Sequence, residues 1–127
     1  MAVPVRHPLD AVGFEITSVD GKTLFYTGDT GPDLSSVWEN ISPQLIIAEV
    51  TWPNSLSTAA RNAGHLCPKM LEKELAKFRR LKGYFPRVVI IHLSPQHEPE
   101  IEREIREVAK LLRISIDIAH EGEELTL

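Results

Sequence analysis

Short apolar runs alternate with polar, turn-forming stretches along the whole chain. The first run is mostly apolar and β-prone, and Asp20-Gly21 after it is typical of a hairpin turn that leads into a returning strand. Two later runs are continuously apolar over residues 45–48 and 88–91, which is the pattern of strands buried on both faces. The predicted strands cover residues 12–19, 23–26, 45–50, 87–93 and 114–119, with a further edge strand at residues 125–127.

Three amphipathic helices are predicted between these strands. Leu34, Val37, Trp38 and Ile41 fall at helical spacing on a short first helix. A second helix opens at Cys67-Pro68 and ends at Gly83, and a third follows Ser94-Pro95. Residues 51–66 are expected to be irregular. The order predicts one α/β domain over residues 1–127, a mixed sheet with helices on one face.

Composition adds few constraints. The chain has 127 residues and a net charge of −4, which gives no electrostatic reason to expect nucleic-acid binding, although such a partner stays open. A basic cluster at residues 77–87 is interpreted as a solvated helix end. No apolar run reaches the length of a membrane span, so no membrane contact is expected. A single cysteine, Cys67, fits a cytoplasmic protein.

Five residues are candidates for chemistry. Asp29, Glu49 and His92 each follow or end an apolar strand, where function usually sits in α/β sheets. His65 lies in a loop before a helix, and His7 precedes the first predicted strand. Each has an ordinary structural explanation, since Asp is common in turns and a buried histidine can be a satisfied core residue.

Taken together, five segments resemble, in order, the motifs of metallo-β-lactamase-fold phosphodiesterases. The likeness is to a histidine before a Gly-aromatic strand, a tyrosine-x-Gly-Asp-Thr motif, an acid-ended strand, a histidine loop and a final histidine. The segments are HPLDAVGFEI (7–16), FYTGDTG (25–31), LIIAEVT (45–51), NAGHL (62–66) and VIIHLS (89–94). Class II cyclic-nucleotide phosphodiesterases, tRNA 3′-end-processing endonucleases and phosphonate-pathway cyclic phosphodiesterases are similar in this respect.

The resemblance implies a role for each residue. His7 and His92 would be terminal ligands to two divalent metals, zinc or alternatively manganese, and Asp29 would bridge them. A hydroxide held by the metals would attack phosphorus. His65 would be a general acid or stabilise the transition state, and Glu49 would orient it. The implied substrate is a small phosphodiester.

One departure from that family affects the expected activity. Its His-x-His-x-Asp-His motif is absent, since histidines occur only at positions 7, 65, 92, 97 and 120. We therefore expect the C-terminal half of a four-layer αββα fold, with the N-terminal half supplied by a longer chain, a separate chain or a homo-oligomer partner. The chain alone is expected to bind metal weakly and to be inactive.

Two other functions stay open. The same fold hydrolyses thioesters, lactones or glutathione esters, and the pair Glu49 and His65 favours phosphoesters because that reaction needs a proton donor. The third hypothesis is a non-catalytic module of this fold that has lost the metals. Cys67 at a helix start is interpreted as a small packed residue, although the helix dipole there could lower its pKa.

Overall fold

The computed structural model describes all residues from Met1 to Leu127 and contains one six-stranded sheet. The strands lie in the sheet in the order in which they occur in the sequence. The first three pair antiparallel, and the last four pair parallel, so the sheet is mixed as predicted. The strands are β1 (Ala2–Pro4), β2 (Val12–Thr17), β3 (Thr23–Tyr26), β4 (Leu45–Glu49), β5 (Arg87–Ile91) and β6 (Ile116–Ile118).

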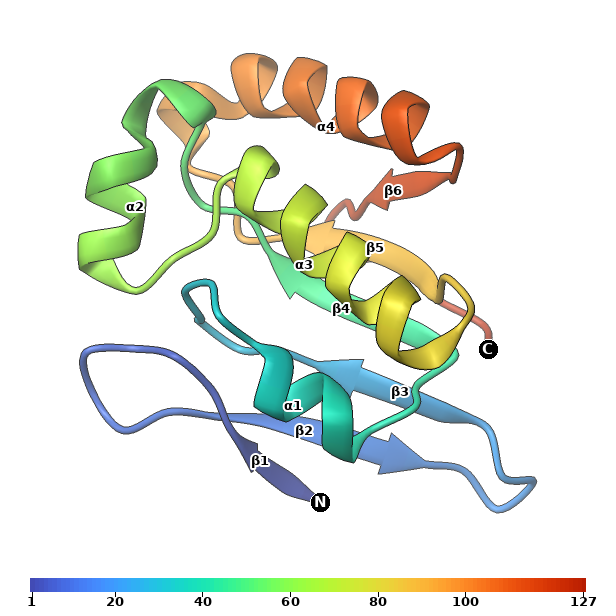
Figure 1. The fold of residues 1–127 in the computed structure, drawn as a ribbon. Coiled ribbons are helices and arrows are strands. Elements are labelled where there is room, and N and C mark those ends of the chain that lie inside the picture. Colours follow the sequence, from blue (N-terminus) through green and yellow to red (C-terminus); the bar gives the residue numbers. More distant parts are fainter.

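Helices α1, α3 and α4 cover one face of this sheet, and α2 lies beyond the ends of the strands (Figure 1). Pro68 occupies the first turn of α3 and Gly83 ends the helix with a φ of 82°, as the sequence predicts. The helices are α1 (Ser35–Asn40), α2 (Ser57–Ala63), α3 (Pro68–Lys82) and α4 (Glu98–Leu112), with short 3₁₀ turns at Asn54–Leu56 and Pro95–His97. No helix is long and apolar enough to cross a membrane.

The core lies between the sheet and these helices. Phe25, Ile46 and Val88 pair across β3, β4 and β5, so all three point to the same face, and each is buried. Trp38 of α1 and Phe78 of α3 pack edge to face above them, with ring centroids 5.5 Å apart. Burial of these apolar side chains between the sheet and the helices stabilises the packing of β3, β4 and β5 under α1 and α3.

The opposite face of β2 and β3 carries exposed apolar side chains. Phe14 pairs with Tyr26 across the two strands, and Val12 and Ile16 lie two positions to either side of Phe14 on the same face. Their exposed fractions run from 38% at Tyr26 to 54% at Ile16. We call these four residues the open face.

Three predictions about elements were wrong. Residues 51–66 contain α2, a short helix with only Ala60 buried, so its sequence shows no apolar stripe. His7 does not precede the first strand but follows β1, which the sequence did not reveal. Residues 125–127 form no strand. Their backbone carbonyls instead accept hydrogen bonds from Lys22 Nζ (2.8 Å) and Arg87 Nη1 (3.1 Å).

Candidate functional site

Three of the candidate residues lie at one edge of the sheet. Because β3, β4 and β5 run parallel, their carboxyl ends meet at the same edge. Asp29 lies in the loop after β3, Glu49 is the last residue of β4, and His92 directly follows β5. His92 has a φ of 60°, in the left-handed region that non-glycine residues seldom adopt, and such residues concentrate at functional sites.

A glycine brings the other two candidates together. Gly64 ends α2 with a φ of 74°, in the left-handed region that glycine adopts readily, and His65 is the next residue. A Cβ at Gly64 would collide with Pro8 and lie 3.0 Å from His7 Cα. The absent side chain therefore lets the loop of His7 lie against the loop of His65, and their rings are 5.6 Å apart.

Glu49 and His65 form a buried acid–histidine pair. Glu49 is fully buried, and its Oε1 lies 2.7 Å from His65 Nδ1. The carboxylate also accepts hydrogen bonds from the backbone N–H groups of Thr30, Thr51 and Leu66. Burial raises the pKa of Glu49, and the His65 imidazole acts in the opposite direction. Because a carboxylate only accepts, His65 donates from Nδ1 and keeps Nε2 free.

Thr51 connects this pair to His92. Its hydroxyl donates to Glu49 Oε2 at 2.9 Å and lies 3.0 Å from His92 Nδ1. A hydroxyl has one hydrogen, so it accepts from His92. Asp29 Oδ1, the other neighbour of this nitrogen at 3.3 Å, also only accepts. The hydrogen-bond network therefore places the proton of neutral His92 on Nδ1 and leaves a lone pair on Nε2.

Each of the three histidines uses Nδ1 for a protein hydrogen bond, but the direction of the bond differs. His65 and His92 donate from Nδ1. His7 instead accepts at Nδ1 from the backbone N–H of Leu9 at 3.3 Å, which places the proton of a neutral His7 ring on Nε2. None of the three Nε2 atoms has a protein partner. Ligand atoms of His7, Asp29 and His65 lie within 4.8 Å of one another, and so do those of Glu49, His65 and His92.

The donor chemistry fits divalent metals. Two imidazoles, His7 and His92, and one carboxylate, Asp29, are ligands that zinc and manganese accept. The side chains of Asp29 and His92 are both 51% exposed, so an ion can reach them. His65 is also near enough to be a ligand, but its Nδ1 is committed to the buried Glu49. The structure thus brings together all five residues singled out in the sequence, and their individual roles stay predictions.

The sequence did not point to Thr51, because a threonine after an apolar strand resembles any strand residue. Only its contacts with Glu49 and His92 reveal its position. Cys67 is fully buried at the start of α3, and burial raises the pKa of its thiol. The packed interpretation fits this cysteine, and the lowered pKa does not.

No protein-family model and no curated protein sequence matches the chain. Solved structures do match its fold. The unliganded yeast PDE1 aligns with a TM-score of 0.77 at 21% identity, over 95% of this chain and 43% of its own. YhfI from Bacillus subtilis, described as a metallo-β-lactamase-fold protein, aligns at 0.74 and 18%, over 97% of this chain and 47% of its own.

The short form of human tRNase Z aligns with a TM-score of 0.66 at 20% identity, over 96% of this chain and 40% of its own. The chain thus spans less than half the length of each of these three proteins. At such identities the likeness concerns the fold, and it agrees with the mixed sheet and single helical layer. The chain therefore has the metallo-β-lactamase fold, of which it forms an α/β half.

Proposed function

We propose that this chain is part of a metal-dependent hydrolase that cleaves a phosphodiester. The observation that carries the proposal is the buried Glu49–His65 pair, 2.7 Å apart, next to the Asp29–His92 pair. Such a site joins a proton donor to a set of metal ligands, the two functions that phosphodiester cleavage uses. Two of the fold neighbours, a phosphodiesterase and a tRNase, are hydrolases, which agrees with this choice.

His7, Asp29 and His92 would hold two divalent ions together with ligands from outside the described chain. When bound, such ions lower the pKa of a water molecule and stabilise charge on the phosphoryl oxygen. Asp29 is suited to bridge them because it lies in an exposed turn and offers two oxygens. Thr51 keeps the His92 ring in the tautomer that presents Nε2 as a ligand atom.

His65 would supply the proton for the leaving oxygen. Because the Nδ1–H of His65 is donated to Glu49, the protonated His65 ring presents Nε2–H on its free side. Glu49 stabilises the imidazolium charge and fixes the orientation of the ring. A positioned general acid of this kind typically contributes about 10²- to 10⁴-fold to the rate.

We further propose that another polypeptide segment completes the site and covers the open face. The motivation is that the chain has three candidate ligands and spans less than half of each fold neighbour. The missing segment could belong to the same natural chain, to a separate chain or to a second copy. The 127-residue chain alone is then expected to be inactive.

The proposal is tested on the full-length natural gene product. Metal content is measured first, and hydrolysis of bis(4-nitrophenyl) phosphate is then compared with that of a chromogenic thioester. We expect bound zinc or manganese and cleavage of the phosphodiester, abolished by chelation. Cleavage of the thioester alone favours the alternative hydrolase, and a protein without metal or activity is a non-catalytic module.

A further inference from the structure

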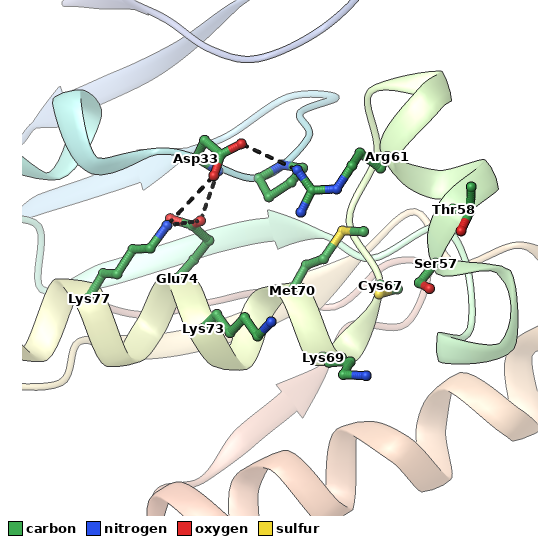
Figure 2. A pocket seen from close by; sticks show the side chains of 11 residues that line it. Asp33, Ser57, Thr58, Arg61, Cys67, Lys69, Met70, Lys73, Glu74 and Lys77 are labelled. Atoms are coloured by element: carbon green, nitrogen blue, oxygen red, sulfur yellow. Dashed lines mark hydrogen bonds and ion pairs between the residues drawn. The ribbon is translucent and has the colours of Figure 1, made fainter.

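Two adjoining hollows extend from the candidate site toward α3. The first is lined by His7 and Gly64, so it opens beside the candidate site. The second lies between α2 and α3 and has a volume of about 240 Å³ (Figure 2). Asp33 and Arg61 line both hollows, so the two lie next to each other. We call the combined feature the groove.

The groove is basic although the chain is acidic. The whole sequence has 14 Lys and Arg against 18 Asp and Glu. The groove reverses this balance, with five cationic side chains against two carboxylates, Asp33 and Glu74. The five are Arg6, Arg61, Lys69, Lys73 and Lys77.

One of the two carboxylates is committed to structure. Glu74 is buried and accepts hydrogen bonds from the two backbone N–H groups just before α1 and from Trp38 Nε1. Lys77 pairs with it at 3.1 Å. This acid therefore neutralises Lys77 and holds α1 on α3.

Asp33, the second carboxylate, pairs with other cations, so Lys69 and Lys73 have no acidic partner. Asp33 lies 3.3 Å from Arg61 and 3.8 Å from Lys77, as the dashed lines in Figure 2 show. Lys69 and Lys73 have no carboxylate within 4.0 Å, although they are one helical turn apart and line the same hollow. Their like charges repel each other without a partner between them.

The surroundings of these lysines suit an anion. Lys69 lies in the first turn of α3, where the positive end of the helix dipole disfavours a cation and favours an anion. Across the hollow, Ser57 and Thr58 of α2 present hydroxyl groups that make no hydrogen bond within the protein. Two ammonium groups and two free hydroxyls line this one hollow, and all four are donors suited to phosphate oxygens.

We propose that the groove binds a second phosphate group of the substrate, apart from the one that is cleaved. This inference rests on the proposed phosphodiester hydrolysis, and it narrows the substrate class. The substrate would carry at least two phosphates, one diester at His65 and another held by Lys69 and Lys73. A cyclic mononucleotide, with one phosphate, would leave the groove empty.

The test compares matched substrates of the full-length gene product. A dinucleotide with and without a 5′-phosphate is assayed together with bis(4-nitrophenyl) phosphate. The variant Lys69→Gln/Lys73→Gln is compared with Arg80→Gln/Lys110→Gln, which removes two exposed charges outside the groove. We expect kcat/KM of the groove variant to fall about tenfold or more on the 5′-phosphorylated substrate only, mainly through a higher KM. The control variant should match the wild type.

A binding measurement separates the groove from catalysis. The 5′-phosphorylated dinucleotide is titrated into wild type and groove variant with EDTA present, and chemical shifts of α2 and α3 amides are followed by NMR. We expect saturable shifts in the wild type that the groove variant loses. Equal shifts with sulfate at the same concentration would identify unselective anion binding and overturn the inference.

The two proposals fail in different ways. If the metal-loaded wild type does not cleave bis(4-nitrophenyl) phosphate, the proposed function fails. If it cleaves this compound but the 5′-phosphate gives no advantage that depends on Lys69 and Lys73, the groove inference is overturned and the proposed function stands. Equal losses on all substrates would also count against the groove.

Discussion

At the scale of single residues, Asp29 is expected to bind metal and His65 to act on the substrate. Asp29 is exposed beside His92, whereas His65 is held by the buried Glu49. In the full-length protein, Asp29→Ala should therefore remove metal and activity together. His65→Ala should keep its metal while the rate falls by about 10²-fold or more. Metal analysis with paired kinetics decides this.

The leaving group offers a control for the same pair. The rate loss in His65→Ala should shrink for nitrophenolate, which needs little protonation on departure. Glu49→Gln should give a milder defect, because it alters only the orientation and charge of the imidazole. If His65→Ala loses metal as completely as Asp29→Ala, His65 is a ligand and the proposed roles are wrong.

Thr51 is expected to act through His92 and Glu49 and not on the substrate. Thr51→Val removes the hydroxyl that accepts from His92 Nδ1 while keeping the shape of the side chain. Outer contacts to a metal-bound histidine typically account for about 10- to 100-fold in metal affinity or activity. We therefore expect weaker metal binding in a competition titration. Thr51→Ser keeps the hydroxyl and should restore it, and a defect of equal size in the serine variant would refute the hydrogen-bond explanation.

At the scale of elements, Gly64 at the end of α2 controls the contact between two loops. Gly64→Ala places a non-glycine residue at a φ of 74° and a methyl group against Pro8 and His7. The left-handed backbone alone costs about 1 to 2 kcal/mol. Gly83 is a matched control, since it ends α3 at a φ of 82° with nothing within 4 Å.

We expect both alanine variants to lower the free energy of unfolding in urea. Gly64→Ala should lower it more, because it adds the collision, and should also weaken metal binding by displacing His7, a proposed ligand. Gly83→Ala should leave metal binding unchanged. Equal unfolding free energies and equal metal binding in the two variants would contradict the role assigned to the Gly64 contact.

The elements differ in how well the sequence predicts them. Helix α3 was predicted at both ends because Pro68 and Gly83 are strong local signals with a physical cause. Helix α2 was missed because it buries only Ala60, which leaves no periodic apolar face. The positions of Asp29, Glu49 and His92 could be predicted because strand ends are visible in the sequence. The Thr51 contacts and the groove could not, since both depend on side chains that meet only in the folded chain.

At the scale of the whole molecule, the open face is expected to mediate association. Phe14 and Ile16 are 45% and 54% exposed on a sheet whose other face is covered by helices. The 127-residue chain alone should therefore self-associate in sedimentation experiments and bind a hydrophobic dye. Phe14→Lys/Ile16→Lys should reduce both without unfolding the chain.

The control for this surface lies on the helices. Leu81→Lys/Leu111→Lys also introduces two charges at exposed apolar positions, which are 49% and 65% exposed. It should leave association and dye binding as in the wild type. A chain that is monomeric at high concentration and binds no dye would contradict the open face as a docking surface.

The order of the strands also determines the order in which the molecule can form. Each strand pairs with the one that precedes it in the sequence, so the sheet can grow at one edge as the chain leaves the ribosome. The hairpin of β2 and β3 needs nothing that is made later. His92 follows β5, and Thr51 connects it by hydrogen bonds to Glu49 at the end of β4. The candidate site is therefore complete only after strands β1 to β5 have been made. A chain whose synthesis stops before His92 would retain the hairpin and lack the histidine that Thr51 orients.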